Sequence, residues 1–123
     1  MELNLERPRD FLFVRKADAH TVTVIDRPFT ASLILARDRV IENWAATDVA
    51  ALTPADVQPI LALGPDIVLL GTGAHQRFPS QEVLATFLKQ GVGVETMDNA
   101  AAARTWDILA GEGRNVVAAF ILA

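Results

Sequence analysis

The first third of the chain contains short apolar segments between polar ones, and residues 21–25 alternate polar and apolar positions with a period of two. β-favouring segments occur there in pairs joined by short polar turns, at residues 11–16 with 21–25 and at 31–35 with 40–44. The segment Asp26-Arg27-Pro28 separates the two pairs and is expected to interrupt the strands. This pattern predicts an antiparallel meander.

The pattern changes after residue 66. Ile67 to Leu70 form a continuous apolar run between Pro65 and Gly71, which is typical of a strand buried on both faces. Later segments predict a helix that begins at Ser80 and ends at Gly91, a strand at 92–96, a helix capped by Asp98 that ends near 111–113, and a strand at 116–122. Short connections between these elements predict a parallel βαβαβ unit.

A shorter helix is predicted between these two regions, from about Thr53 to Leu63. Thr53-Pro54 supplies a capping hydroxyl and a proline suited to the first helical position. Pro59 is compatible with the helix only in its first turn, because a proline further along removes a backbone hydrogen bond. Asp56 is therefore an alternative cap.

The helix after Asp98 carries polar side chains on its expected inner face. At 100° per residue one stripe contains Ala101, Ala102, Thr105, Ile108, Leu109 and Glu112. A buried Glu112 needs a partner, and Arg114 is the nearest candidate. The simplest interpretation is a local ion pair that orients the turn into the last strand. Trp106 lies off this stripe and is expected in the core or at its rim.

Gly71-Thr72-Gly73 follows a buried strand, where α/β proteins often place ligand-binding loops. A small anion or metabolite site assisted by Arg77 or His75 competes with a purely structural glycine turn, since the dinucleotide fingerprint is incomplete. Glu95 ends the neighbouring strand and could face the same crevice. The candidate binding or polar cluster therefore comprises Gly71, Thr72, Gly73, Arg77, Glu95, Thr105, Glu112 and Arg114.

The composition argues against several classes of binding and location. A length of 123 residues fits a single domain over 1–123, and the net charge of −4 with scattered basic residues argues against nucleic-acid binding. The chain has no cysteine and two isolated histidines, so we expect no metal site, and no cofactor is expected. No apolar run is long enough for a membrane span, and the N-terminus does not resemble a secretory signal, so a cytoplasmic location is expected.

Several spaced motifs resemble one family. These are Gly71-Thr72-Gly73, Gly93-x-Glu95-x-Met97-Asp98, and Ala102-x-x-Thr105-Trp106-x-x-Leu109-x-x-Glu112-Gly113-Arg114. They resemble the family of the mitochondrial complex I assembly factor three and its uncharacterised bacterial and archaeal relatives, over roughly residues 30–123. Asp107 departs from the asparagine usual there. The resemblance implies a three-layer α/β domain with a mixed sheet and no established enzyme activity.

Three hypotheses follow for function. The first is a non-catalytic interaction or assembly factor with a protein partner, associated peripherally with a membrane respiratory complex by analogy with the mitochondrial members. The second is a binder of a small anion or metabolite, or an enzyme, that uses the crevice near Gly71-Thr72-Gly73. The third assigns the charged motif around Glu112 to a buried structural network. The sequence presents no catalytic constellation, so catalysis ranks last.

Overall fold

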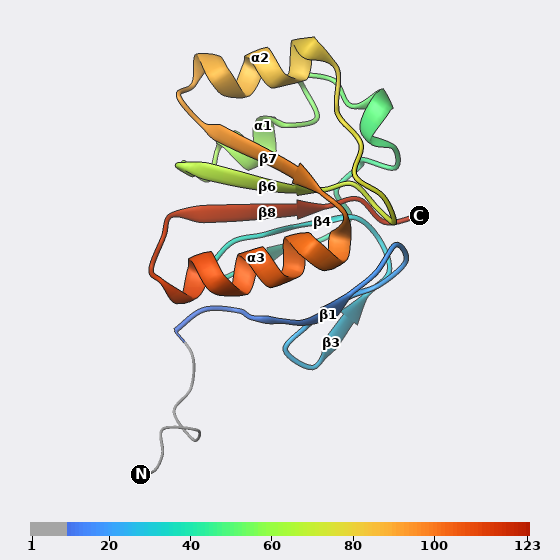
Figure 1. Cartoon of the computed structure of the whole chain (residues 1–123), viewed down its shortest axis with the longest axis vertical. Coiled ribbons are helices and arrows are strands. Elements are labelled where there is room, and N and C mark those ends of the chain that lie inside the picture. The colour runs from blue at the N-terminus through green and yellow to red at the C-terminus, as the bar shows by residue number, and fades with distance from the viewer. Residues whose placement is uncertain (1–9) are drawn as a thin grey trace.

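The computed structural model describes residues 10–123 and is built around a five-stranded sheet (Figure 1). The strand order is β5-β4-β8-β6-β7, with bounds Val40–Ile41, Leu33–Leu35, Val116–Phe120, Ile67–Gly71 and Gly93–Met97. β6 pairs in parallel with both β7 and β8, whereas β4 pairs antiparallel with β8 and β5. The predicted α/β class with a mixed sheet is confirmed.

The central strands bury side chains on both faces, as their continuous apolar runs predict. All five residues of β8 are buried. Ala118 and Phe120 belong to one apolar cluster, while Val117 and Ala119 belong to the other, on the opposite face of the sheet. Period-two alternation therefore divides one apolar strand between two cores.

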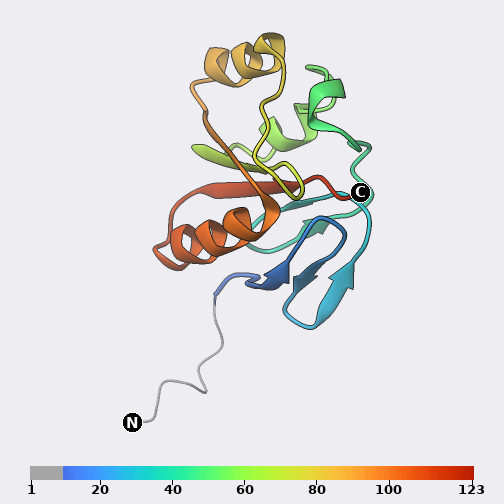
Figure 2. The same ribbon diagram turned by 45° about the vertical axis from the view of Figure 1, so that its right-hand side comes forward.

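Each face of the sheet is covered by different elements (Figures 1 and 2). Helices α1 (Gln58–Leu61) and α2 (Gln81–Lys89) lie on one side with a short 3₁₀ helix, η2 (Val49–Ala51). Helix α3 (Asn99–Gly111) and a small sheet lie on the other side. The layers are thus helices, central sheet, and a mixed layer of helix and small sheet.

Local capping signals place the helix starts where the sequence predicts them. The Ser80 hydroxyl accepts a hydrogen bond from the Val83 N–H, and the Asp98 carboxylate accepts one from the Ala101 N–H. α1 begins later than expected, at Gln58 with Val57 as its cap residue. Pro59 consequently lies in the first turn, where its missing N–H costs little.

The predicted meander is divided between two sheets. β1 (Val14–Ala17), β2 (Val22–Val24) and β3 (Arg27–Phe29) form a separate antiparallel sheet, while β4 and β5 join the central one. The expected interruption at Asp26-Arg27-Pro28 is wrong, because Arg27 and Pro28 belong to β3. A turn with Ile25 at φ 56° precedes this strand, and Pro28 is tolerated because β3 is an edge strand.

The predicted inner stripe of α3 is wrong at Ile108 and Glu112, whereas Ala102 is buried as expected. Trp106 is fully buried, whereas Ile108 is 60% exposed. The buried residues are Asn99, Ala102, Ala103, Trp106 and Ala110. The indole Nε1–H of Trp106 donates to the Leu12 carbonyl at 2.8 Å, so its polar group is satisfied in the core. Burial of this large ring, with small alanines on either side, decides the orientation of the helix.

Candidate functional site

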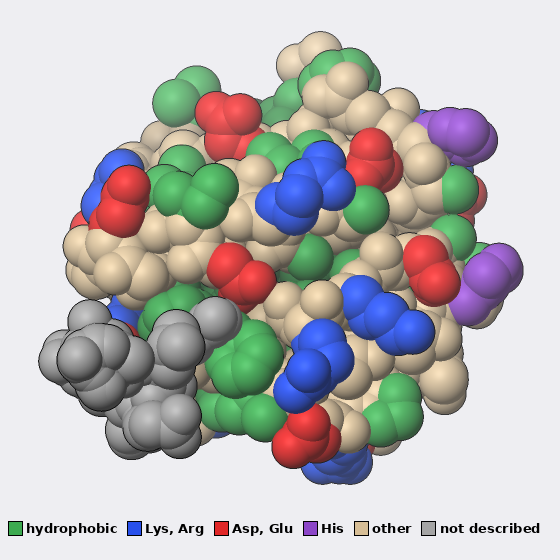
Figure 3. All heavy atoms as spheres, turned by 60° about the horizontal axis from the view of Figure 1, so that its bottom comes forward, with side chains coloured by type: hydrophobic (Ala, Val, Ile, Leu, Met, Phe, Trp, Pro, Cys, Tyr) green, Lys and Arg blue, Asp and Glu red, His purple; other side chains and the backbone are tan. Residues whose placement is uncertain are grey.

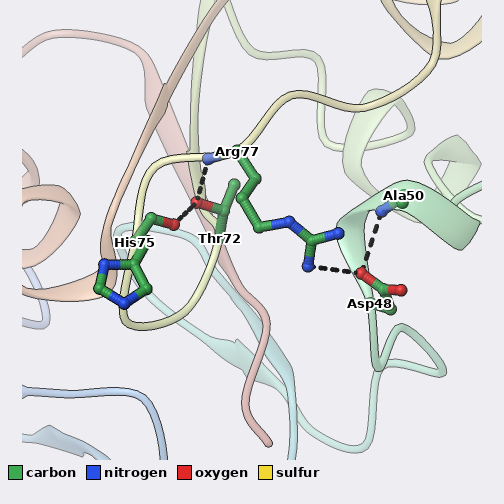
Figure 4. Close-up of polar contacts among 5 residues, drawn as sticks. All are labelled: Asp48, Ala50, Thr72, His75 and Arg77. Atoms are coloured by element: carbon green, nitrogen blue, oxygen red, sulfur yellow. Dashed lines mark hydrogen bonds and ion pairs between the residues drawn. The ribbon is translucent and has the colours of Figure 1, made fainter.

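The loop after β6 is organised by the hydroxyl of Thr72 (Figure 4). This hydroxyl donates to the His75 carbonyl at 2.6 Å and accepts from the Arg77 N–H at 3.1 Å. The backbone N–H of Thr72 donates to the Met97 carbonyl at the end of β7. Thr72 is buried, so its side chain holds the turn over residues 72–77 in one conformation.

Arg77 connects this loop to the segment before η2. Its guanidinium lies 2.9 Å from Asp48 Oδ1, and the same carboxylate caps η2 by accepting from the Ala50 N–H (Figure 4). Both side chains are about half exposed, so the ion pair is screened by solvent. Its main effect is to fix the two loops side by side.

Asn99 is the polar centre of this end of the sheet. Its side chain is fully buried and makes three hydrogen bonds. Oδ1 accepts from the Gly73 N–H at 3.1 Å, and Nδ2 donates to the Asp18 and Ile121 carbonyls, both at 3.0 Å. The amide thus joins the β6 loop, the β1–β2 turn and the end of β8. A Cβ on Gly71 would overlap Asn99 Oδ1, so glycine is required there for the close approach.

A cavity of about 370 Å³ opens beside this network. We call it the crevice; it is lined by Ala19, His20, Thr47, Asp48, Val49, Thr72, Gly73, Ala74, His75, Arg77, Ile121 and Ala123. Its position at the carboxyl ends of β6 and β8 is the one expected for a ligand loop in an α/β sheet. The ionisable side chains at its wall are His20, His75, Arg77 and Asp48.

The turn between β1 and β2 borders the crevice. The Asp18 carboxylate accepts hydrogen bonds from the His20 and Thr21 N–H groups, both at 2.8 Å. These two donors, His20 first, hold the pKa of Asp18 below its ordinary value, with smaller contributions from the charges of His20 and Lys16. The ionised carboxylate therefore stabilises the turn that carries His20.

Only part of the predicted cluster meets at the crevice. Thr72, Gly73 and Arg77 line it, and Gly71 precedes them in the buried strand β6. Glu95 lies exposed in the middle of the edge strand β7, and Thr105 is half-buried on α3. Neither of these two residues lines the crevice.

The inward orientation predicted for Glu112 is wrong. Glu112 and Arg114 are both exposed, and no ion pair joins their side chains. They occupy the turn after α3, at the amino end of β8 and so at the opposite end of the sheet from the crevice. The turn is held by its backbone, since the Arg114 N–H donates to the Leu109 carbonyl and Gly113 has φ 80°. A buried charged network is therefore absent from this turn.

The sequence interpretation missed Asn99. It assigned the helix start to Asp98 and did not consider the next residue. The available signal was an asparagine in the first turn of a helix that leaves a β-strand, where a side-chain amide can reach neighbouring backbone. Its three partners, however, lie 22 to 81 residues away along the chain and cannot be deduced locally.

Asp107 also has a role that the sequence did not indicate. Its Oδ1 accepts a hydrogen bond from the Val14 N–H at 2.9 Å, which ties β1 to α3. The Val14 N–H needs only a hydrogen-bond acceptor, so the Asp107 carboxylate can fill this role although it lacks the amide donor of an asparagine. Within residues 10–123, no group of three His, Cys, Asp or Glu side chains is arranged to hold a metal ion.

Comparison with known proteins agrees with this architecture. A protein of Xanthomonas campestris, solved by NMR, is 44% identical, with a TM-score of 0.84 over 99% of this chain and 92% of that one. A crystal structure from Bordetella parapertussis is 31% identical, with a TM-score of 0.85 over 95% of this chain and all of that one.

A curated relative carries a name that refers to a membrane. The "13 kDa major membrane protein" of Francisella tularensis subsp. holarctica is 34% identical over 85 residues, which are 68% of this chain and 69% of that protein. None of the helices in residues 10–123 combines the length and apolar character needed to cross a membrane. Residues 14–121 match the family described as protein of unknown function, DUF498/DUF598, and the chain belongs to that family.

Proposed function

We propose that this protein is a non-catalytic interaction factor that binds a protein partner through α2 and the loop before it. The observation that carries the proposal is the exposure of two large apolar side chains in this region. Phe78 in the loop is 66% exposed, and Leu88 on α2 is 77% exposed. Aromatic and large apolar side chains supply most of the binding free energy in protein interfaces, so an exposed phenylalanine beside a structured loop is a candidate anchor.

The hydrogen bonds of the adjoining loop support this proposal. The Thr72 hydroxyl and the Gln76 amide are engaged by backbone carbonyls of the loop and of β7. Arg77, which precedes Phe78, is fixed by Asp48. These contacts restrain the segment that presents Phe78, so little conformational entropy remains to be lost when a partner binds.

The expected partner belongs to a membrane-associated assembly. One relative, 34% identical over 85 residues, is named as a major membrane protein. The sequence motifs that resemble those of respiratory assembly factors are the second reason for this proposal, and they suggest transient attachment to a membrane complex during its maturation. In this view the chain contacts the complex at the membrane surface.

The test is affinity capture from native cells in mild detergent. Wild-type protein should recover one partner in a stoichiometric amount, and the double variant Phe78→Ser, Leu88→Ser should lose it. Ile108→Ser is the matched control, because Ile108 is similarly exposed at 60% but lies on α3, on the other side of the sheet. Repeated recovery of the protein alone, or equal loss with the control, would contradict the proposal.

A second candidate function uses the crevice. Its volume of about 370 Å³ and its wall of Thr72, Gly73 and Arg77 suit a small anion or metabolite. A thermal-shift screen with anionic metabolites should then reveal a ligand, because a ligand that binds only the folded state raises its stability. Arg77→Ala should abolish that shift, whereas Arg114→Ala should leave it unchanged. A shift that persists in Arg77→Ala would place the ligand elsewhere.

A further inference from the structure

A second cavity lies between β1 and α3. Its volume is about 270 Å³, and it shares no lining residue with the crevice. We call it the β1–α3 cavity; residues 14–17 of β1 line one wall, and Ala100, Ala103, Arg104 and Asp107 of α3 line the other. The small side chains of Ala100 and Ala103 leave the space between strand and helix open.

Three basic residues line this cavity, and two of them lack an ionic partner. Arg15 is bound to Asp26 at 3.0 Å, and its Nε donates to the Ile25 carbonyl. Lys16 and Arg104 are exposed and form no ion pair within residues 10–123. In contrast, ion pairs engage Arg15, Arg27, Arg37, Arg39 and Arg77. Two basic residues without an ion-pair partner among residues 10–123 therefore border one small cavity.

Each carboxylate near the cavity has a partner other than Lys16 and Arg104. Asp107 accepts a hydrogen bond from the Val14 N–H, and Asp18, just beyond β1, accepts from the His20 and Thr21 N–H groups. Asp26 pairs with Arg15. Figure 3 shows Lys and Arg side chains interspersed with Asp and Glu side chains on the side of the molecule that lies at the bottom of Figure 1. These acidic side chains therefore make the electrostatic potential of this face less positive, but none of them in the described part of the chain forms an ion pair with Lys16 or Arg104.

We propose that the β1–α3 cavity binds a phosphate group through Lys16 and Arg104. A phosphate carries enough negative charge to compensate both side chains. Its oxygens accept charge-assisted hydrogen bonds from a guanidinium fork and from an ammonium group. The cavity is near the lower end of the usual size range for ligand sites, on the order of 300 Å³, which fits a small phosphate ester or a lipid headgroup. This site does not depend on the partner surface around Phe78.

The first experiment measures which phosphate source binds. Chemical-shift titrations with inorganic phosphate and with glycerol 3-phosphate test a soluble ligand. Co-sedimentation with phosphatidylcholine vesicles, with and without phosphatidylglycerol, tests a headgroup. Saturable binding in either arm, centred on residues of β1 and α3 and weakened by added salt, supports the site.

The second experiment uses matched cation variants. Lys16→Gln and Arg104→Gln should each weaken binding about fivefold to tenfold, the effect of removing one charge-assisted contact. Lys89→Gln and Arg114→Gln are the controls, because these two residues are also exposed and also lack an ion pair within residues 10–123. All four residues are exposed, so circular dichroism should confirm that every variant folds.

Two outcomes would overturn the site. One is the lack of saturable binding in both arms. The other is an equal loss of binding in the cavity variants and in the controls, which would mean that phosphate responds only to overall charge. Neither outcome bears on capture of a protein partner through Phe78 and Leu88, so this inference and the proposed function fail separately.

Discussion

The two ends of the five-stranded sheet use polar side chains in opposite ways. At the carboxyl ends of β6 and β8, Asn99 and Thr72 are buried and bind backbone groups from three separate segments. At the amino end of β8, Glu112, Arg114 and Asn115 are exposed. The polar residues of the first end determine where loops lie. At the second end, Glu112 and Arg114 lie in a turn that its backbone already defines, and of the three side chains only that of Asn115 binds distant backbone among residues 10–123, namely the Gly64 carbonyl, at 2.9 Å.

Burial distinguishes the polar residues that stabilise this α/β fold from those that do not. A buried side chain that satisfies distant backbone groups cannot be removed without leaving those groups unpaired. When an exposed side chain is removed, water can take over the hydrogen bonds that it made. Substitutions at the two ends of the sheet test this difference between buried and exposed polar side chains.

Replacement of Asn99 by alanine should have the largest effect. The variant leaves the Gly73 N–H and the Ile121 carbonyl without their partner in a buried site, and we expect a loss of about 3 kcal/mol in the free energy of unfolding. Asn99→Asp should be no better, because its second oxygen would face two carbonyls. Urea denaturation measures both variants, and near-wild-type midpoints would show that the network is not structural.

Replacement of Gly71 by alanine tests the packing around Asn99 at the same end of the sheet. The new Cβ would overlap Asn99 Oδ1 and press on the Phe120 ring, so we expect a loss of about 2 kcal/mol, in the range of overpacked cores. Gly93→Ala is the matched control on the neighbouring strand β7, because a Cβ there meets only the Asp66 carbonyl at 3.9 Å. Equal midpoints for the two variants would refute the close approach of Asn99.

Acidification should loosen the β1–β2 turn next to the crevice. The pKa of Asp18 is held below its ordinary value in the folded protein, so its contribution to stability is present above the unfolded pKa of about 4 and is lost as pH falls through the lower folded value. The protection of the Thr21 amide against hydrogen exchange, measured relative to its intrinsic rate at the same pH, should therefore fall in this acidic window. In Asp18→Asn that additional pH dependence should disappear.

Substitution at the amino end should have the smallest effect. Glu112→Gln and Arg114→Gln should each change the free energy of unfolding by less than about 0.5 kcal/mol, as is usual for exposed positions. A double-mutant cycle should give no coupling between them. A coupling above about 1 kcal/mol would restore the ion pair that the sequence suggested.

The sequence by itself determined the features that depend on neighbouring residues. The order of strands and helices after residue 66, the caps at Ser80 and Asp98, and the burial of β6 and β8 on both faces follow from local periodicity and capping chemistry. The carboxyl end of β6 could also be predicted as a crevice, because parallel strands place their loops at one edge.

Tertiary structure decided the features that depend on distant partners. The orientation of α3 was set by burial of Trp106 against both sheets, which turned Ile108 and Glu112 outward. The division of the meander and the role of Asn99 likewise arise from contacts between segments far apart in the chain. A helical wheel weighs all apolar residues alike, but the folded core favours the residue that buries the largest area. The packing of distant elements therefore determined which polar residues became structural and which stayed in water.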